Sequence, residues 1–192
     1  MHHPLKTAGV IALTSLGLSL PVRAAAQETL QAGAMIVSSV SGAGGSLCLF
    51  VPNTRDRTPV EARPCPFNSG GRPELGFLWQ VRRDPAGGVT VLSLASDVRA
   101  ADGRRMEVAD WSTASHAAIQ IWGANLFDSS NQRWNLVPGP GGGVSLVSVR
   151  SGLCLDLPLS YGSPRVNGPV QQFPCHGGDN QRWSFLPVIS DR

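Results

Sequence analysis

The tetrapeptide Asn-Gln-Arg-Trp occurs twice in the chain, at residues 131–134 within NQRWNLV and at residues 180–183 within NQRWSFL. Each copy continues into an apolar, strand-like stretch that ends in a proline. A third tryptophan, Trp79 in FLWQV, lies upstream at a similar interval. Recurrence of a motif at a spacing of tens of residues is typical of internal repeats. The chain is therefore expected to consist of three similar units.

Each unit divides into four short stretches of strand-like composition, separated by turns rich in glycine and proline. These stretches are 35–40, 47–51, 60–65 and 77–81 in the first unit, 89–94, 98–102, 118–122 and 133–137 in the second, and 144–149, 153–157, 170–175 and 182–186 in the third. Only Ala114–Ile121 could form a helical turn. The pattern predicts an all-β fold of twelve strands in three pseudo-threefold repeats, about 34–84, 88–138 and 143–189, and a β-trefoil fits it best.

The first 26 residues have the layout of a secretory signal peptide. A short basic start precedes the apolar run AGVIALTSLGLSL, and small residues follow at 24–26, as at a signal-peptidase site. The apolar run is too short to span a bilayer comfortably, so no membrane insertion is expected. We expect residues 27–192 to form the mature domain of a secreted or periplasmic protein, with a buried N-terminal helix as the alternative for residues 1–26.

The charge balance argues against polyanionic partners. The chain has 16 basic and 13 acidic residues, and two of the basic ones, Lys6 and Arg23, lie in the expected signal peptide. The mature chain is therefore almost neutral and has no long-range attraction for nucleic acid or anionic membranes. Partners of these two kinds are not expected.

With these repeats the chain resembles the ricin B-type lectins, whose repeats carry a Gln-x-Trp signature. The signature stands here at residues 132–134 and 181–183. The resemblance covers the mature chain and is strong in the second and third repeats and weak in the first. It implies that the tryptophans pack into a shared core, where each indole N–H needs a partner, and that the glutamines tie down a neighbouring loop. These residues are Trp79, Trp134, Trp183, Gln132 and Gln181.

The third repeat contains the residue types that sugar binding requires. A sugar has hydroxyls, which a carboxylate and amides can hydrogen-bond, and an apolar C–H face, which an aromatic ring can cover. Asp156 lies in CLDL, Gln171 and Phe173 in VQQFPC, and Asn180 in the repeated tetrapeptide. Positions two apart on a strand face the same side, so Gln171 and Phe173 are expected to point together. The resemblance implies that these four residues bind sugar.

The second repeat is expected to carry a similar set, made of Asp102, Gln120, Trp122 and Asn131. The segment from Asp102 to Gln120 is three residues longer than its counterpart in the third repeat. An aspartate before a glycine, as in Asp102-Gly103, is alternatively a simple turn residue. Two aromatic residues in the loops of these repeats, Trp111 and Tyr161, are expected to contact further sugar units or to cover the surface.

The first repeat departs from the pattern. Phe50 stands where the aspartate is expected, Arg63 replaces the aromatic residue, and Gly76-Phe77 replaces Asn-Gln. We expect no sugar site there, and Asp56 is the alternative carboxylate.

Four cysteines allow three disulfide connectivities and fit an oxidising compartment. In our alignment the second repeat has alanines, Ala100 and Ala124, where the third has its two cysteines. Joint loss of both cysteines is the result expected for a disulfide within a repeat. We therefore expect the pairs Cys48–Cys65 and Cys154–Cys175. No cysteine has zinc-site spacing, so neither a metal nor a cofactor is expected.

Catalytic motifs are weak. His116 and His176 have no evident serine or cysteine partner, and the glycine-rich run at 139–143 lacks the lysine of a phosphate loop. The expected function is that of a non-catalytic lectin domain that binds galactose-type sugars through the second and third repeats. The alternatives are the cell-binding subunit of a bacterial toxin similar to cytolethal distending toxins, which would have a toxin or enzyme subunit as partner, and a β-trefoil protease inhibitor.

Overall fold

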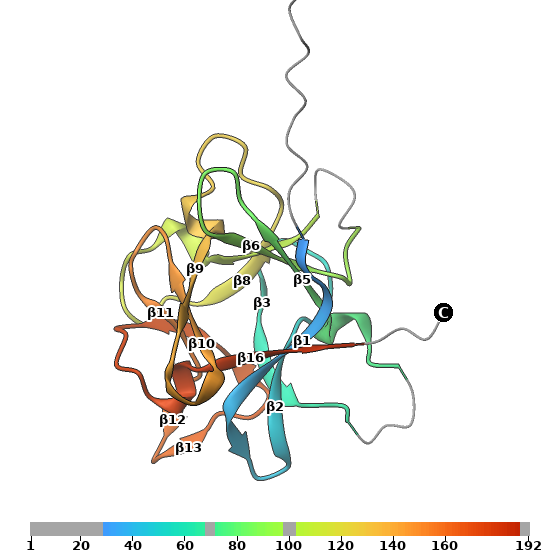
Figure 1. Ribbon diagram of the computed structural model, residues 1–192, viewed down its shortest axis with the longest axis vertical. Helices are drawn as coiled ribbons and strands as arrows, with labels where there is room; N and C mark the ends of the chain where they lie inside the picture. Colours follow the sequence, from blue (N-terminus) through green and yellow to red (C-terminus); the bar gives the residue numbers. More distant parts are fainter. Residues whose placement is uncertain (1–28, 68–71, 98–102, 189–192) are drawn as a thin grey trace, which may run out of the picture.

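The protein is described by a computed structural model over residues 29–67, 72–97 and 103–188 (Figure 1). The described part is built of β-strands and short 3₁₀ turns, without an α-helix. The strands are β1 (Thr29–Gly42), β2 (Gly45–Phe50), β3 (Thr58–Pro59), β4 (Glu61–Pro64), β5 (Trp79–Arg83), β6 (Val89–Ser93), β7 (Arg105–Val108), β8 (Ile119–Trp122), β9 (Trp134–Pro138), β10 (Val144–Ser148), β11 (Cys154–Asp156), β12 (Leu159–Ser160), β13 (Ser163–Pro164), β14 (Gly168–Pro169), β15 (Gln171–Phe173) and β16 (Trp183–Pro187). The 3₁₀ turns are η1 (Leu75–Phe77), η2 (Ala109–Trp111), η3 (Ser130–Gln132), η4 (Pro140–Gly142) and η5 (Asp179–Gln181).

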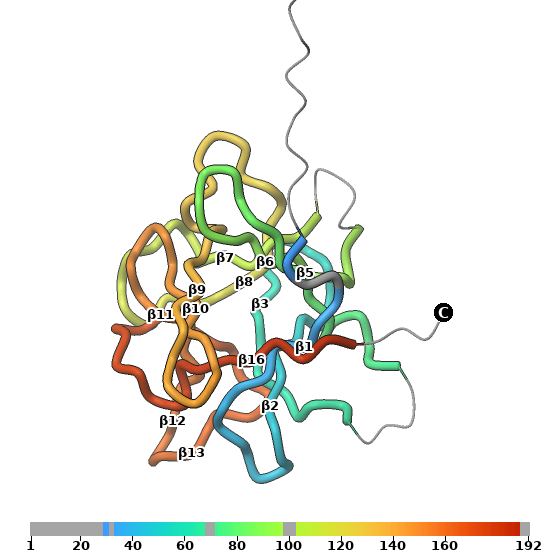
Figure 2. Tube along the Cα trace, viewed as in Figure 1, coloured from blue at the N-terminus to red at the C-terminus, as the bar shows by residue number. Residues whose placement is uncertain are grey.

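Six strands close into an antiparallel barrel. The pairing runs from β1 to β5, β6, β9, β10 and β16, and β16 pairs with β1 again. Figure 2 shows how this closure brings β1 and β16, from opposite ends of the described chain, side by side. Each repeat supplies two neighbouring barrel strands, so all three repeats share one interior.

The other long strands form one hairpin in each repeat. These hairpins are β2–β4, β7–β8 and β11–β15, and each is joined to the barrel through its first strand. The all-β prediction is confirmed, and each expected unit supplies two barrel strands and one hairpin. The count of twelve strands is not confirmed, because the described residues contain sixteen strand segments, including the two-residue pieces β3, β12, β13 and β14. In the second repeat the first hairpin strand is β7, whereas the stretch expected there, 98–102, lies outside the described residues.

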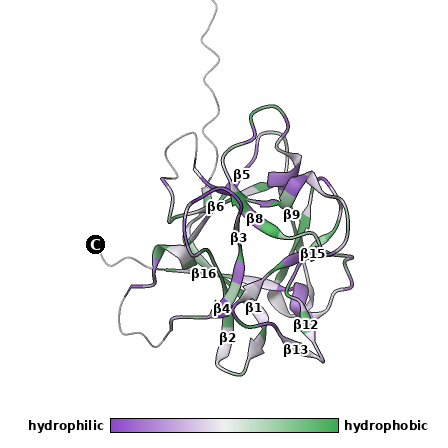
Figure 3. Ribbon diagram, turned by 180° about the vertical axis from the view of Figure 1, so that it is seen from behind, coloured by the Kyte–Doolittle hydropathy of each residue, from purple (hydrophilic) through white to green (hydrophobic). Residues whose placement is uncertain are grey.

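Three tryptophans fill the centre of the barrel. Trp79, Trp134 and Trp183 are fully buried in one apolar cluster. Their indole nitrogens donate hydrogen bonds of 3.2, 3.2 and 3.1 Å to the backbone oxygens of Leu49, Met106 and Leu155. Each indole therefore joins the last barrel strand of its repeat to the hairpin of the same repeat. The structure thus places the three tryptophans in the core, where the resemblance implied they would lie, and Figure 3 shows hydrophobic stretches of β6 and β8 toward the middle of the fold.

The three hairpins meet in a closed ring of backbone hydrogen bonds. The amide of Val60 donates to the oxygen of Ile119 (2.9 Å), Ile119 donates to Val170 (3.2 Å), and Val170 donates to Val60 (2.9 Å). All three residues are buried. Because each repeat gives and receives one bond, the ring marks the pseudo-threefold axis and sets the positions of the next residues in each hairpin.

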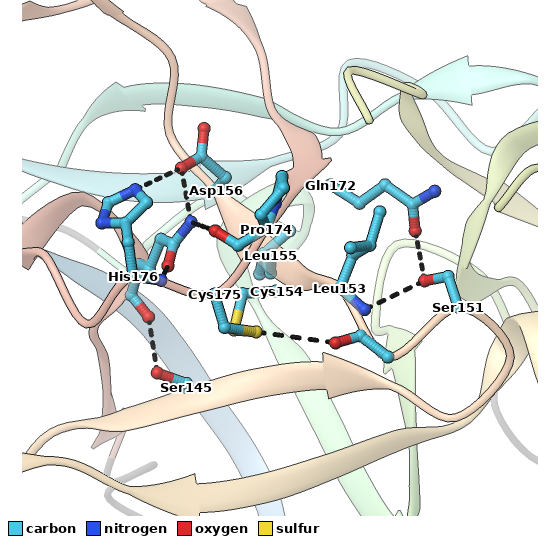
Figure 4. The surroundings of a disulfide bond; sticks show 12 residues. Ser145, Ser151, Leu153, Cys154, Leu155, Asp156, Gln172, Pro174, Cys175 and His176 are labelled. Carbon is cyan, nitrogen blue, oxygen red and sulfur yellow. Dashed lines mark hydrogen bonds and ion pairs between the residues drawn. A yellow bond between two sulfur atoms is a disulfide. The ribbon is translucent and has the colours of Figure 1, made fainter. Parts of the chain in front are cut away.

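Both expected disulfides are present. Cys48 pairs with Cys65 and Cys154 with Cys175, and each bond closes the hairpin of its own repeat. Figure 4 shows the second disulfide between β11 and the segment after β15, close to Asp156. The described chain holds no free cysteine, and none of its helical segments has the length and hydropathy needed to cross a membrane.

Replacing Cys154 and Cys175 together by alanine is expected to lower the free energy of unfolding by about 3 kcal/mol, because the disulfide restricts the unfolded chain. The same double replacement at Cys48 and Cys65 should have a similar effect, since the sequence separations are 21 and 17 residues. Urea denaturation of the oxidised protein and both variants measures the difference. A loss below about 1 kcal/mol in either variant would contradict this expectation.

Candidate functional site

A hollow of about 450 Å³ opens on the hairpin of the third repeat. It contains all four residues that the third repeat was predicted to contribute, together with two histidines and the segment after β11. Its lining residues are His116, Asp156, Pro158, Leu159, Gln171, Phe173, His176 and Asn180. The structure therefore brings the predicted constellation together, although it is spread over β11, β15 and η5.

Asp156 forms the floor of this hollow, and its side chain is almost completely buried. One carboxylate oxygen accepts a hydrogen bond from Gln171 (2.8 Å), and the other accepts bonds from Asn180 (2.8 Å) and Gln181 (3.0 Å). A carboxylate has about four lone-pair positions, so three amide donors leave acceptor capacity on the oxygen that faces Gln171. The amide donors hold the carboxylate in one orientation.

The signature glutamine of the third repeat connects the floor of the hollow to its rim. Gln181 accepts a hydrogen bond from the backbone amide of His176 (2.9 Å) and donates one to the carbonyl oxygen of Pro174 (3.0 Å), besides its bond to Asp156. Gln132 makes the same contacts in the second repeat. It accepts a hydrogen bond from the backbone amide of Asn125 (2.9 Å) and donates one to the carbonyl oxygen of Gly123 (2.7 Å). Each glutamine thus bonds to the backbone of the loop that follows the second hairpin strand of its repeat.

The carboxylate of the second repeat is Glu107. It accepts hydrogen bonds from Gln120 (2.9 Å), Asn131 (3.0 Å) and Gln132 (2.9 Å). Glu107 is paired with Gln120 across its hairpin in the same register as Asp156 with Gln171. The predicted residues Gln120, Trp122 and Asn131 are thus grouped around Glu107, while Asp102 lies outside the described residues.

Glu107 was not predicted as a site residue for two reasons. The aspartate of the third repeat made aspartate the expected residue type, and Asp102 is the acidic residue that best matched it. The pairing of β7 with β8 also places Arg105 opposite Trp122, and in the third repeat Cys154 lies opposite Phe173 in the equivalent pair. Arg105 therefore stands at the cysteine position that we had assigned to Ala100, a residue outside the described part. The alternation of charged and apolar residue types in RMEV, directly before Ala109, was the available signal for this strand.

A second hollow, of about 290 Å³, lies on the hairpin of the second repeat. Its lining residues are Arg57, Glu107, Asp110, Trp111, Gln120, Trp122 and Asn125. Trp111 is therefore placed where it could contact a bound molecule, as one of its two predicted roles required. Tyr161 is fully exposed at the turn between β12 and β13 and is not among the residues that line either hollow.

In the first repeat the carboxylate position is filled by an aromatic ring. Phe50 packs on Phe77 with ring centroids 4.5 Å apart, and the Arg63 guanidinium covers the Phe50 ring at 4.1 Å. Arg63 also forms an ion pair with Glu61 at 2.8 Å. These contacts occupy the positions that the carboxylate, the aromatic platform and the first amide take in the other repeats.

Asp56, the alternative carboxylate, belongs to the surroundings of the second repeat. It accepts a hydrogen bond from the backbone amide of Gly123 (3.0 Å) and forms an ion pair with Arg104 (3.1 Å). Asp56 is thus held between the loop after β8 and the residue directly before β7. Within the described ranges, no group of three or more histidine, cysteine, aspartate or glutamate side chains is arranged to bind a metal ion.

Burial raises the pKa of the Glu107 carboxyl above its ordinary value of 4.5, although hydrogen bonds from Gln120, Gln132 and Asn131 act in the opposite direction. The negative charge of Asp56 adds to the increase. Glu107 therefore keeps its proton in the folded state at pH values where it has lost it in the unfolded state. The ionised carboxylate accepts hydrogen bonds on both oxygens, whereas the protonated form has an O–H donor, so the hydrogen-bonding capacity of the second hollow changes as pH falls through this raised pKa.

The raised pKa of Glu107 predicts a pH-dependent stability. Below pH 4.5 the carboxyl is protonated in both states, and from there up to its raised pKa the unfolding free energy should fall as pH rises. The Glu107→Gln variant has no ionisable group at position 107, so its unfolding free energy should fall less over this pH range. Urea denaturation of both proteins across this pH range tests the effect. Asp128→Asn is the matched control, because the backbone amide of Ser130 lowers the pKa of Asp128 from its ordinary value of 3.8, so this carboxyl is ionised in both states over the tested range.

Gly76 is required by the packing of the first repeat. A Cβ at this position would lie 2.4 Å from the backbone oxygen of Val51 and 2.7 Å from the Phe50 ring. Gly76→Ala is therefore expected to destabilise the protein by about 1–3 kcal/mol, as measured by thermal or urea denaturation. Gly44→Ala is the matched control, since its Cβ would meet no atom closer than 3.8 Å. Equal stability of the two variants would contradict the expectation.

Three solved structures illustrate the similarity of the fold. The designed threefold-symmetric protein ThreeFoil is 25% identical, with a TM-score of 0.64, over 81% of this chain and 99% of that chain. The Haemophilus ducreyi cytolethal distending toxin is 18% identical, with a TM-score of 0.56, over 81% and 85%. The Polyporus squamosus lectin is 19% identical, with a TM-score of 0.55, over 80% of this chain and 48% of its own.

The comparison with curated proteins gives no match. The family described as ricin-type β-trefoil lectin domain-like matches residues 77–164 and 130–191, which together exceed half of the chain. The match begins at the end of the first repeat and covers both hollows apart from Arg57. With the six-stranded barrel, the three buried tryptophans and the repeated carboxylate–amide sets, it shows that the chain belongs to the ricin-type β-trefoil lectin domain-like family.

Proposed function

We propose that this chain is a non-catalytic carbohydrate-binding domain that recognises galactose-type sugars through the hollows of its second and third repeats. The observation that carries the proposal is the repeated hydrogen-bonded set. In both repeats a buried carboxylate is held by three amides beside a partly buried aromatic residue, Trp122 or Phe173. Family membership supports carbohydrate binding, and the type of sugar is part of the proposal.

The arrangement suits the chemistry of a sugar. A hydroxyl can donate to a free lone pair of Asp156 and accept from the second N–H of the Gln171 amide, because a hydroxyl has both functions. Phe173 offers an apolar surface to the C–H face of the same ring. The second hollow offers Glu107 and Trp122 in the same roles. In the first repeat Phe50 and Arg63 leave no carboxylate at the equivalent position.

Galactose is the favoured sugar type because of the family resemblance, and a fold neighbour agrees with it. The Polyporus squamosus lectin was solved with a Neu5Acα2-6Galβ1-4GlcNAc epitope, which contains galactose. A single shallow site is expected to bind a monosaccharide with a Kd on the order of 1 mM. Two sites on one rigid domain would raise the avidity for a multivalent glycan by effective concentration.

We also propose that the domain works outside the cytoplasm. Residues 1–26 have the composition of a signal peptide, and the two disulfides are consistent with an oxidising environment. The binding domain would then comprise residues 27–192. No metal or cofactor takes part in the proposed binding.

Isosteric replacements at the two carboxylates test the proposal. Asp156→Asn and Glu107→Gln should each weaken binding to immobilised galactose, and the double variant should abolish it, because the amide replaces an acceptor oxygen by a donor. Asp102→Asn is the control that separates the two assignments for the second repeat. It should bind like the wild type if Glu107 is the carboxylate that contacts sugar. A glycan array with the same four variants identifies the preferred sugar.

Two outcomes would contradict the lectin proposal. One is a wild-type protein that binds no glycan, and the other is a double variant that binds as well as the wild type. Unchanged binding in Glu107→Gln together with weakened binding in Asp102→Asn would return the second site to Asp102. A protease inhibitor, the third alternative, predicts no effect of the Asp156 replacement on inhibition.

A second candidate is the cell-binding subunit of a toxin. Two apolar side chains of the first repeat, Phe67 and Leu75, are 49% and 57% exposed, and this repeat has lost the sugar-binding set. The cytolethal distending toxin of Haemophilus ducreyi shares the fold over 85% of its matched chain. This candidate predicts a stable complex with a second exported protein that is lost in Phe67→Ser/Leu75→Ser and kept in Asp156→Asn, as judged by co-purification from the source organism.

A further inference from the structure

Each hairpin receives a hydrogen bond from a turn in the preceding repeat. The backbone amides of Arg57, His116 and Asn167 donate to the oxygens of Ile121 (3.1 Å), Gln172 (2.8 Å) and Ala62 (2.8 Å), respectively. All three turn residues have positive φ, at 67°, 66° and 57°, which is uncommon for residues other than glycine. Each lies three positions before a member of the buried backbone ring.

In two of these turns, the side chain of the residue with positive φ lies in the hollow of the following repeat. His116, from the second repeat, lines the hollow of the third repeat, and Arg57, from the first repeat, lines the hollow of the second. Both hollows are thus built from two repeats, although the expected sugar-binding sets came from one repeat each.

His116 contacts two members of the set in the third repeat. Its Nδ1 atom lies 3.1 Å from the side-chain oxygen of Gln171, and its ring centroid lies 4.8 Å from that of Phe173. The amide nitrogen of Gln171 donates to Asp156, so the Gln171 oxygen faces His116. Because an amide oxygen can only accept, Nδ1 carries the proton, and Nε2 of the neutral ring has a free lone pair.

Arg57 occupies the equivalent place in the second hollow with different chemistry. Its guanidinium lies 5.4 Å from the centre of the Trp122 ring and 3.9 Å from the carboxylate of Asp110. A guanidinium has donors and no acceptor. The two hollows therefore share their carboxylate and amides and differ in the residue received from the preceding repeat.

The other rim position also differs between the hollows. His176 lies 3.7 Å from Asp156 through Nε2, and its Nδ1 accepts a hydrogen bond from the amide of Gly178 (3.1 Å). Asn125 takes this place in the second repeat, where its side chain donates to Asn131 (2.9 Å). Because His176 has both nitrogens directed at protein groups, His116 is the imidazole whose Nε2 is available to a sugar.

We propose that His116 is a sugar-positioning residue of the third-repeat hollow. It holds the Gln171 amide so that its nitrogen points at Asp156, it covers one side of Phe173, and it presents Nε2 as an acceptor for a sugar hydroxyl. The inference rests on the proposed sugar binding and adds to it a specificity element: the third hollow prefers a sugar with a hydroxyl donor toward His116, and the second hollow lacks that acceptor.

The experiment is a titration of the uniformly ¹⁵N-labelled full domain with D-galactose, followed by NMR. The side-chain amide signals of Gln171 and Asn180 report on the third hollow, and the indole signal of Trp122 reports on the second. His116→Gly keeps the positive φ without strain. It should weaken galactose at the third hollow by about tenfold, the effect of one lost hydrogen bond of ordinary strength with its orienting partner. The affinity of the second hollow should stay unchanged.

Two further variants separate positioning from a structural effect. Arg57→Gly makes the same change in the equivalent turn and should leave the third hollow unaffected. His116→Asn tolerates positive φ and can donate to Gln171, so it should recover part of the lost affinity. In the wild type the ¹⁵N shifts of His116 should show a protonated Nδ1, and galactose should move the Nε2 signal.

The possible failures are distinguishable. If galactose moves no signal of either hollow in the wild type, the proposed galactose binding and the role of His116 are both overturned. If it moves the Gln171 and Asn180 signals equally in the wild type and in His116→Gly, only the role of His116 is overturned. Equal weakening of both hollows in His116→Gly would also overturn it, because that result indicates a general loss of structure.

Discussion

The ring of three backbone hydrogen bonds among Val60, Ile119 and Val170 is the constraint on which the remaining geometry depends. Buried amide and carbonyl groups must be paired, and in this ring each repeat can satisfy its own groups only through the next repeat. Once the ring is formed, the following residue and the third residue after the ring point out of each hairpin. In the third repeat these are Gln171 and Phe173, so the same interaction that joins the repeats also places the amide and the aromatic platform of the hollow.

The core and the hollow are connected through adjacent residues. The indole of Trp183 is bonded to the oxygen of Leu155, the residue directly before Asp156, and Gln181 is bonded to Asp156 itself. The tetrapeptide Asn-Gln-Arg-Trp thus sets three things within four residues: an amide beside the carboxylate, a glutamine that joins it to the rim, and an indole that anchors its strand. The hollow therefore needs no ligand to take its shape.

Sequence reasoning could predict the features that repeat with constant spacing. The tryptophans, the signature glutamines, both disulfides and the grouping of the third-repeat set follow from motifs that recur along the chain. Glu107 was missed because its repeat has a different loop length and a different acid, so that alignment by residue type favoured Asp102. His116 was considered solely as a catalytic residue, since its partner Gln171 is 55 positions away in the sequence. A contact that depends on the closure of three repeats leaves no local pattern.

The first repeat has apolar packing at the position where the other two repeats bury a carboxylate. A carboxylate loses hydration when it is buried, and the raised pKa of Glu107 reflects this cost even with three amide donors. In the first repeat Phe50 fills the same position with apolar surface, packs against Phe77 with the two rings tilted, and is covered by Arg63. Gly76 permits this packing because a side chain there would strike the Phe50 ring. The same position in the fold therefore holds either an apolar ring or a buried carboxylate, and only the carboxylate gives the hollow beside it a hydrogen-bond acceptor.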